Sequence, residues 1–302
     1  MNLPLPMIDG VSPSSHWLPA GHWKTMLDFL NERFPAIASS TWISRMAKGE
    51  LVDDTGMCLT PGSPYRAGAR IFYYRELESE AGIPFDAHIL YQDEHLLVVD
   101  KPHFLPVIPA GRFLHETLLV RLKKKLQLEE LVPLHRLDRE TAGIVLLSVN
   151  KATRGDYASL FHHRKVRKVY VALAPALRDM SFPLTRRSRI VPGEPFFRMK
   201  EVDGAPNSET HIEVIDKGED STSGQMFYRL MPVTGRKHQL RLHMSGLGIP
   251  IVNDRLYPKL SLPPLAGTDD SFSSPLKLLA KSVSFADPVT GREHYFQSSR
   301  VL

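Results

Sequence analysis

The order of short strand-like runs and interspersed helical patterns in this sequence is compatible with an α+β fold. The strand-like runs combine β-branched and aromatic residues and are bounded by Gly, Pro or Asp. The helical segments repeat apolar residues every three or four positions. Apolar residues make up 42% and charged residues 24% of the 302 residues, which is ordinary for a globular protein with a sizeable core.

The N-terminal part of the chain predicts an arm followed by two short helices. Residues 1–22 are rich in Pro, Ser and Gly without periodicity, so we expect an extended arm with little structure. Residues 23–34 carry apolar side chains at helical spacing. The Ser-Ser-Thr run at residues 39–41 offers an N-cap for a second helix at residues 42–48.

Composition and charge separate the first 80 residues from the rest. A strand-like run at residues 69–77 is followed by a polar link with Gly and Pro at residues 78–88, so we expect a domain boundary near residue 82. Residues 1–80 hold 7 Lys/Arg and 9 Asp/Glu, whereas residues 81–302 hold 31 and 24. The positive excess suggests a polyanionic partner, and a solvated basic surface is the ordinary alternative.

Several classes of protein are excluded by what the sequence lacks. The single cysteine, Cys58, excludes an intrachain disulfide and a cysteine-rich zinc site, which favours a reducing compartment, so we expect the cytoplasm. The sequence has no signal-peptide pattern and no run of eighteen apolar residues, so we expect no membrane association. Because it has no Gly-rich phosphate loop and no metal-ligand spacing, we expect no cofactor and no metal.

The second part of the chain predicts further strands and helices. The expected elements are two strands around a polar turn at residues 92–94, helices at 114–126 and 151–163, a buried strand at 144–149 and a basic strand from 164 onward. Residues 178–224 show turns at Pro192-Gly193, Asp203-Gly204 and Gly218, so we expect loops and hairpins that reach around a bulky substrate.

The most informative stretch surrounds Asp138, which lies between Arg136 and Arg139 and is followed by Gly143 and an apolar run. Neighbouring cations favour the charged form of a carboxyl group, so Asp138 should stay ionised even if partly buried, which makes it a candidate nucleophile or base. Gly143 permits a turn or a close backbone approach, so we expect Asp138 on a loop at the mouth of a core strand. The alternative is that Asp138 caps a turn or pairs with an arginine on the surface.

Three motifs resemble those of the RluA family of pseudouridine synthases. HRLDRETAG, at residues 135–143, is similar to the family signature His-Arg-Leu-Asp-x-x-Thr-Ser-Gly, with Ala142 in place of Ser. KVYVA, at residues 168–172, resembles Lys-x-Tyr-x-Ala, and TGRKHQLRLH, at residues 234–243, resembles the third motif. The resemblance covers roughly residues 89–297, and three motifs in the correct order are far more specific than any one of them.

The resemblance implies roles for individual residues. It makes Asp138 the catalytic carboxylate, Tyr170 the active-site tyrosine and Arg241 the arginine paired with Asp138. A fork from Arg241 to that carboxylate would fix its rotamer and lower its pKa. Arg136 would fill the space left by a flipped-out nucleotide. The residues expected to bind RNA are Arg136, Arg164, Lys165, Arg167, Lys168, Arg236, Lys237, His238 and Gln239.

Some positions depart from the family pattern or allow two interpretations. Asn253 replaces a glycine in GIPIVNDRLY, and Leu279 and Asp287 replace two histidines of the closing strand, so these positions cannot carry any role of those histidines. Lys101 ends the strand-like run LLVVDKP at residues 96–102, which resembles a further family motif that precedes the three above. The lysine is either solvent-facing or an RNA contact.

The resemblance also implies the fold and its division. It predicts the pseudouridine synthase fold, a mixed and mostly antiparallel sheet with flanking helices and the active cleft along its middle, at residues 83–302. Residues 23–80 resemble the small α+β RNA-binding module named after ribosomal small-subunit protein four, although their negative balance argues against strong phosphate binding.

The implied activity is isomerisation of uridines in ribosomal or transfer RNA to pseudouridine by a monomer, with RNA as its partner. Asp138 would either attack C1′ or take the C2′ proton. One alternative is a non-catalytic RNA-binding or RNA-chaperone protein that uses the same basic cleft. Another is a glycosidase, which needs two carboxylates, and no second acid accompanies Asp138 in a comparable sequence context.

Overall fold

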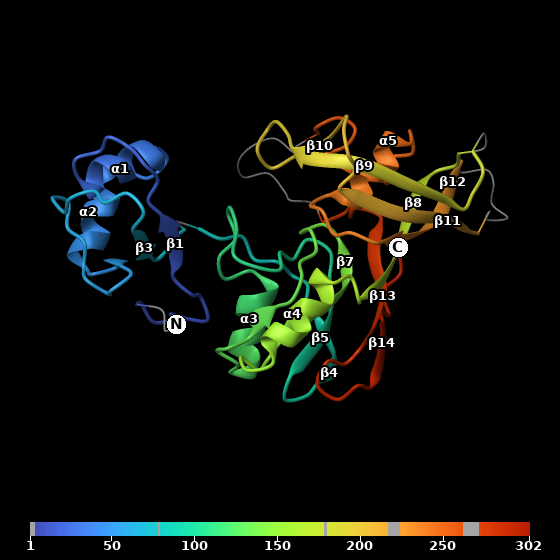
Figure 1. The fold of residues 1–302 in the computed structure, drawn as a ribbon, viewed down its shortest axis with the longest axis horizontal. Coiled ribbons are helices and arrows are strands. Elements are labelled where there is room, and N and C mark those ends of the chain that lie inside the picture. The colour runs from blue at the N-terminus through green and yellow to red at the C-terminus, as the bar shows by residue number, and fades with distance from the viewer. Residues whose placement is uncertain (1–3, 78, 178–179, 217–223, 262–271) are drawn as a thin grey trace. The chain divides into compact units, whose positions relative to one another are not determined.

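The computed structural model describes residues 4–77, 79–177, 180–216, 224–261 and 272–302 (Figure 1). The chain forms two compact units. The smaller comprises Met1–Ala81, Pro109–Glu116 and Val120–Glu129, and the larger comprises the remaining residues. The first division therefore lies between Ala81 and Gly82. Two later segments also belong to the smaller unit, which the sequence did not lead us to expect.

The smaller unit is a three-stranded antiparallel sheet with two helices. Its elements are β1 (Ser14–Trp17), α1 (Met26–Arg33), α2 (Ser39–Ala47), β2 (Leu51–Asp53) and β3 (Arg70–Tyr73), with β3 between β1 and β2. Helix α1 begins at a capping box, in which Thr25 and Asp28 each accept a hydrogen bond from the other's backbone N–H. Phe29 and Trp42 pack with Ile71 in the core between helices and sheet.

Two expectations for this unit are corrected by the structure. Residues 14–17 are not an unstructured arm, because Ser14 pairs with Tyr73 and Trp17 with Arg70 across β1 and β3. A strand of four residues is too short to produce a recognisable alternation, and it is stabilised by its neighbour. Helix α2 begins at Ser39 itself, with Ala38 as an N-cap that makes no side-chain hydrogen bond.

The larger unit is built on one mixed sheet. Its strands are β4 (His88–Gln92), β5 (Leu96–Lys101), β6 (Val132–Pro133), β7 (Ala142–Ser148), β8 (Arg167–Pro175), β9 (Leu184–Pro192), β10 (Met199–Val202), β11 (Ser208–Asp216), β12 (Gln225–Pro232), β13 (Leu278–Ala286) and β14 (Glu293–Gln297). Their order is β10-β9-β11-β12-β8-β13-β7-β5-β4, with β14 beside β13 and β6 beside β7. Only β13 and β7 are parallel among the described pairs, so the expected mostly antiparallel sheet is confirmed.

Two helices cover parts of this sheet, and most of a third belongs to the smaller unit. They are α4 (Arg154–His162), α5 (Gln239–Gly246) and α3 (Leu118–Leu126). Tyr157 and Leu160 of α4 pack on β5 and β7, and Leu240 and Met244 of α5 pack on β8 and β12. Helices α3 and α4 were expected near these positions, at residues 114–126 and 151–163, whereas no helix was predicted at the position of α5.

Strand β7 is buried along its whole length, as its apolar run predicts. Gly143 has a φ of 113°, and a Cβ added there would lie 2.2 Å from the carbonyl oxygen of Ala280 on β13. The expected close backbone approach is therefore confirmed, and no other residue fits between these two strands. This contact fixes the start of β7, and with it the loop that carries Asp138.

The region expected to contain loops and hairpins is more regular than its sequence suggested. Strands β9 and β11 each have nine residues and pair with one another, and β10 extends β9 as a hairpin. The turns expected at Pro192-Gly193 and Asp203-Gly204 lie at the two ends of β10. The turn expected at Gly218 lies outside the described residues.

Candidate active site

A pocket opens at the middle of the larger sheet, where β12, β8, β13 and β7 are successive neighbours (Figure 1). The pocket is open to solvent, and its cavity volume is about 110 Å³. It is lined by Arg136, Leu137, Asp138, Thr141, Lys168, Tyr170, Pro232, Thr234, Gly235, Arg236, His238, Gln239, Leu240, Arg241 and Leu278. Asp138 is the one carboxylate among these described lining residues.

Asp138 lies on the loop that enters β7, as expected. A backbone hydrogen bond of 3.1 Å from Thr141 N to the carbonyl oxygen of Asp138 closes the turn that follows it. The Asp138 side chain remains 28% exposed, and its Oδ2 accepts a hydrogen bond of 3.2 Å from Arg241 Nη1. His238 Nε2 lies 3.8 Å from the other carboxylate oxygen. Asp138 is therefore bound by groups from a distant part of the chain, which differs from the simple surface pairing that the sequence left open.

The guanidinium fork of Arg241 is directed at a different carboxylate from the one expected. Nε and Nη2 of Arg241 donate to the two oxygens of Asp254 at 2.8 and 2.6 Å, whereas Asp138 receives one bond from Nη1. Asp254 is 1% exposed and also accepts from the backbone N–H groups of Leu256 and Tyr257. Asp254 therefore orients the guanidinium of Arg241, and the remaining nitrogen, Nη1, positions Asp138.

The charges around Asp138 determine its protonation. Burial raises the pKa of this carboxyl group, but His238, Arg241 and Lys101 together outweigh burial and hold the pKa below its usual value. Since burial also lowers the pKa of His238, Arg241 supplies the positive charge that persists at neutral pH. Asp138 is therefore ionised under physiological conditions, as expected.

A third carboxylate beside Arg241, after Asp138 and Asp254, was also missed by the sequence. Glu140 Oε2 lies 3.7 Å from Arg241 Nη2, and burial raises the pKa of Glu140 although three arginines oppose this effect. Glu140 is not among the residues that line the pocket. The pKa values of Asp138 and Glu140 are thus shifted in opposite directions, and only Asp138 lines the pocket, so the pair does not face a common substrate as a glycosidase requires.

Tyr170 lines the pocket from β8, where it pairs with Leu230 of β12 and Ala280 of β13. Burial and the negative charge of Asp138 raise the pKa of Tyr170, so its hydroxyl group stays protonated. That hydroxyl group makes no hydrogen bond to a described residue, which leaves it free for a ligand. The structure therefore brings Asp138, Tyr170 and Arg241 together, as the motif order predicted.

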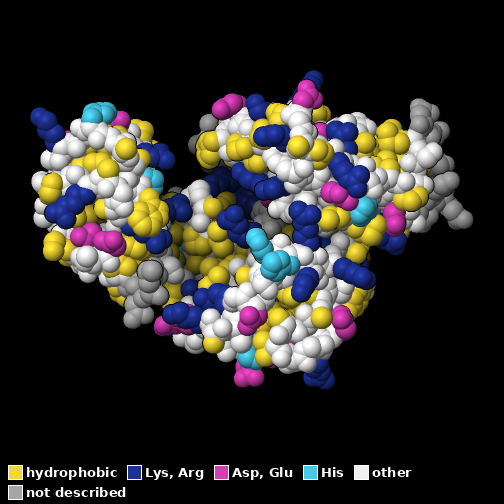
Figure 2. Space-filling model, viewed as in Figure 1, with side chains coloured by type: hydrophobic (Ala, Val, Ile, Leu, Met, Phe, Trp, Pro, Cys, Tyr) yellow, Lys and Arg dark blue, Asp and Glu magenta, His cyan; other side chains and the backbone are white. Residues whose placement is uncertain are grey.

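The cations expected to bind RNA fall into two groups. Arg136, Lys168 and Arg236 line the pocket, and Arg136 is exposed with no hydrogen-bond partner among the described residues. Arg164 and Lys165 are exposed just before β8, Arg167 is its exposed first residue, and Lys237 is exposed on the turn before α5. Lys and Arg side chains form several patches on the visible face of the larger unit, with fewer acidic side chains between them (Figure 2).

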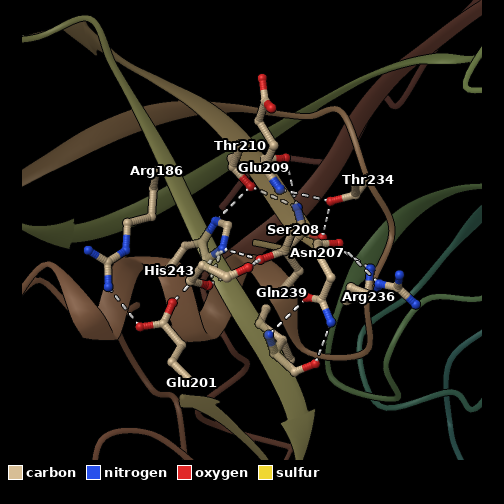
Figure 3. Close-up of polar contacts among 12 residues, drawn as sticks. Arg186, Glu201, Asn207, Ser208, Glu209, Thr210, Thr234, Arg236, Gln239 and His243 are labelled. Atoms are coloured by element: carbon tan, nitrogen blue, oxygen red, sulfur yellow. Dashed lines mark hydrogen bonds and ion pairs between the residues drawn. The ribbon is translucent and has the colours of Figure 1, made fainter. Parts of the chain in front are cut away.

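Gln239 is a structural residue of this site, in contrast to its expected contact with RNA. It is 4% exposed, and its oxygen accepts from Thr234 Oγ1 and Arg236 N. Its amide nitrogen donates to the carbonyl oxygen of Glu209 and to Thr210 Oγ1 (Figure 3). No donor or acceptor of this side chain remains for a ligand, so Gln239 instead holds the turn that presents Arg236.

The same network continues to His243, a buried residue of α5 that the sequence did not single out (Figure 3). Its Nδ1 lies 2.9 Å from Thr210 Oγ1, and its Nε2 lies 3.0 and 3.1 Å from the hydroxyl groups of Ser208 and Ser188. These contacts fix α5 to β9 and β11. Arg241 lies two residues before His243 on the same helix, so these contacts also fix the backbone position from which the Arg241 side chain extends.

His243 leads to a prediction about stability in acid. Burial lowers the pKa of His243 to about 4, whereas an unfolded chain protonates the same ring near 6.5. The unfolded state therefore gains the proton first, and stability is lost as pH falls from 6.5 towards 4. Replacing His243 with Gln should reduce the drop in unfolding free energy between pH 7.5 and 4.5 by up to about 3 kcal/mol, measured by urea denaturation. An unchanged drop would contradict this assignment.

Lys101 is neither solvent-facing nor in contact with RNA, so both interpretations of its sequence position are wrong. It is fully buried, and its Nζ donates to the carbonyl oxygens of Pro102, Leu105 and Arg139. Burial lowers the pKa of Lys101 to about 7. It ties the end of β5 to the loop residue that follows Asp138.

Asp287 replaces a family histidine and takes a structural position. It is almost fully buried, accepts from Tyr157 Oη at 2.6 Å and accepts from the backbone N–H groups of Val289 and Thr290.

Within the described ranges, His, Cys, Asp and Glu side chains form no group of three or more that is arranged to hold a metal ion. None of the described helices is both long and apolar enough to cross a bilayer.

Comparisons with known proteins agree with this geometry. Residues 95–246 match the family described as RNA pseudouridylate synthase. The chain is 31% identical over 235 residues to an uncharacterized RNA pseudouridine synthase of Synechocystis, covering 77% of this chain and 79% of that protein. It is 33% identical over 218 residues to the dual-specificity RNA pseudouridine synthase RluA of Salmonella typhimurium, covering 69% and 91%. The structure of human RNA pseudouridylate synthase domain containing 1 is similar, with a TM-score of 0.55 and 25% sequence identity. The match covers 74% of this chain and 86% of the human chain.

The fold and these matches define an isomerase that acts on uridines in RNA. The chain belongs to the RluA family of RNA pseudouridine synthases. The alternative of a non-catalytic RNA-binding protein is not favoured, because the matching relatives are named as synthases. The residues that sequence reasoning missed are Asp254, Glu140 and His243, although all three lie in motifs that resemble the family's; their burial was the missing information.

Proposed function

We propose that Asp138 is the catalytic carboxylate of this pseudouridine synthase, with Arg241 and Tyr170 as its partners. The observation that carries this proposal is that an ionised and partly exposed Asp138 is the one acid lining a pocket otherwise rich in cations. Such a pocket suits a nucleotide, because cations attract its phosphate while a single carboxylate faces the sugar.

The reaction needs no external reagent. The N1–C1′ bond of uridine breaks, the base turns, and a C5–C1′ bond forms, while C5 loses a proton to solvent and N1 gains one. Asp138 either attacks C1′ or removes the C2′ proton. The hydroxyl group of Tyr170, protonated and without a partner among the described residues, is suited to donate to the uracil or to relay its proton.

A uridine within a helix reaches the pocket only if it is flipped out of the stack. Arg136 is exposed at the pocket and has no partner among the described residues, which supports a role in filling the vacated space. We propose ribosomal or transfer RNA as the substrate, a monomer as the active form and the cytoplasm as its location. The RNA contact of the smaller unit, with its resemblance to a ribosomal-protein module, stays a prediction.

The proposal is tested by mapping pseudouridine in RNA from cells that lack this protein. Wild-type protein should restore the lost sites, and Asp138→Asn should restore none of them although it is expressed at the same level. If Asp138→Asn restores every site, Asp138 is not the catalytic carboxylate.

The exposed cations at the start of β8, Arg164, Lys165 and Arg167, predict how RNA binding depends on salt concentration. Replacing Arg164, Lys165 and Arg167 with Gln should make the slope of log K against log salt concentration less steep by about 0.7 for each phosphate that is no longer neutralised, or roughly 2 in total. The rate at saturating RNA should stay within about twofold, since these exposed side chains lie outside the pocket lining. Titrations at several salt concentrations measure the slope, with the exposed Arg292→Gln as a control. An unchanged slope would show that these three side chains do not neutralise RNA phosphates.

A further inference from the structure

Strands β9 and β10 of the larger unit form a hairpin (Figure 1). One of its faces packs on α5, and the other carries two exposed cations. On the inner face, Ile190 and Met199 pack with Leu242 of α5. On the outer face, Arg189 and Lys200 are exposed, and neither has a hydrogen-bond or ion-pair partner among the described residues. The hairpin is therefore fixed from within while two free cations face solvent.

The tip of this hairpin presents an aromatic ring to solvent. Phe196 is 86% exposed, whereas the turn around it is closed by backbone hydrogen bonds from Gly193 N to Arg198 O and from Arg198 N to Pro195 O, of 3.1 and 2.8 Å. The neighbouring Phe197 ring meets it edge-on at 5.5 Å. A single exposed apolar residue is common and carries little meaning by itself. Here, however, a closed turn holds the ring away from the core.

The tip is also joined to the wall of the active-site pocket through Tyr257. Arg198 donates to the carbonyl oxygen of Pro258, and its guanidinium lies 5.1 Å from the Tyr257 ring centroid. The Tyr257 hydroxyl group accepts from Met199 N at 2.8 Å and lies 2.8 Å from Nδ1 of His238, which lines the pocket. One buried side chain thus connects the hairpin tip to the pocket that contains Asp138.

We propose that Phe196 stacks on an unpaired base of the RNA substrate beside the uridine held in the pocket, with Arg189 and Lys200 contacting the phosphates. This inference rests on the proposed function, in which the pocket at Asp138 takes the target uridine. Aromatic side chains stack on any base, and cations beside them follow the RNA backbone. The free cations favour RNA over a protein partner, although Glu194 is also exposed at the tip.

Kinetics on a purified stem-loop RNA, containing a uridine that the wild-type enzyme modifies, test the contact. Phe196→Ala should raise KM about tenfold while kcat stays within about twofold. Phe196→Tyr should resemble wild type, and Phe196→Leu should resemble Phe196→Ala because it lacks a ring. Tyr295→Ala removes another exposed aromatic, 64% accessible on β14, and should change neither constant. An unchanged KM for Phe196→Ala, as expected for a protein partner, or a wild-type KM for Phe196→Leu, overturns the proposal.

Ultraviolet cross-linking to the same RNA separates this proposal from the catalytic one. Trypsin cleaves after Arg189 and Arg198, so Phe196 lies on a peptide of residues 190–198 that contains no internal cleavage site. In Asp138→Asn protein, this peptide should carry an RNA adduct that Phe196→Ala abolishes. If Asp138→Asn is fully active, the catalytic proposal fails while the adduct still decides the role of Phe196. Adducts on other peptides but not on this one overturn the stacking contact.

Discussion

Purified Asp138→Asn protein should show a kcat at least about a thousandfold below wild type on a substrate RNA. Asparagine has nearly the shape of aspartate and still accepts the bond from Arg241, so the fold and the RNA affinity should be preserved. It has no negative charge, however, and serves neither as nucleophile nor as base. Single-turnover rates at saturating enzyme measure the effect apart from binding.

Glu140→Gln is the matched control for this variant. Glu140 lies beside the same arginine, 3.7 Å from its Nη2, but outside the pocket lining, and its pKa is raised rather than lowered. The single-turnover rate of Glu140→Gln should remain within about tenfold of wild type, because the Glu140 side chain does not line the pocket. If Asp138→Asn keeps more than a tenth of the activity, or if Glu140→Gln is the more damaging change, the roles of the two acids are reversed.

The lowered pKa of Asp138 predicts the acid limit of the reaction under the proposed mechanism. In that mechanism the active form is the carboxylate, so the rate of the chemical step should be lost only as pH falls through the folded-state pKa, which lies below the usual value of 3.8. The single-turnover rate of protein that is still folded should therefore show no acid limb attributable to Asp138 above about pH 4. This separates the catalytic group from the buried histidines, which affect stability at higher pH.

Arg241→Met should destabilise the protein by about 3–5 kcal/mol and abolish activity. The guanidinium is almost fully buried, and it is the ion-pair partner of Asp254, Asp138 and Glu140. Its removal leaves Asp254 charged in a site that is 1% exposed. It also removes the charge that lowers the pKa of Asp138. Urea denaturation at pH 7 measures the loss of stability, and single-turnover kinetics measure the loss of activity.

A second substitution separates the structural role of Arg241 from the role proposed for it beside Asp138. Combining Arg241→Met with Asp254→Leu replaces the buried ion pair by apolar side chains, so most of the lost stability should return. Activity should not return, because Asp138 still lacks its hydrogen-bond donor. Arg241→Lys should also fail, since an ammonium group cannot make the fork to Asp254 and reach Asp138 together. Wild-type activity in the double variant would show that Arg241 has no role beyond supporting the fold.

The sequence predicted the central element of the site because that element depends on local chemistry. The apolar run of β7 and the glycine before it indicated a buried strand and a close backbone approach, and both are present. Arg136 and Arg139 beside Asp138 in the sequence predicted its ionised state, which is found although His238, Arg241 and Lys101 produce it. The order of three motifs predicted that Tyr170 and Arg241 join Asp138. Each of these inferences used residues near one another in the chain or an ordered set of short patterns.

The sequence did not predict which groups share a partner. Asp254 lies 13 residues after Arg241 and Asp138 lies 103 residues before it, yet both bind the same guanidinium. Five donors in a fixed plane are divided among competing acceptors according to their geometry, which is set by packing of α5 against the sheet. Lys101 is a similar case, because its polar head suggested solvent while three carbonyl groups receive it inside the fold.

The amino-acid sequence by itself determined the family and the basic character of the larger unit, since these follow from residue identity and spacing. Only the tertiary structure decided that Asp254 takes the arginine fork, that Gln239 is saturated and that Phe196 is held in solvent. The physical reason is that burial and hydrogen-bond saturation depend on neighbours from distant parts of the chain, which residue identity alone does not specify.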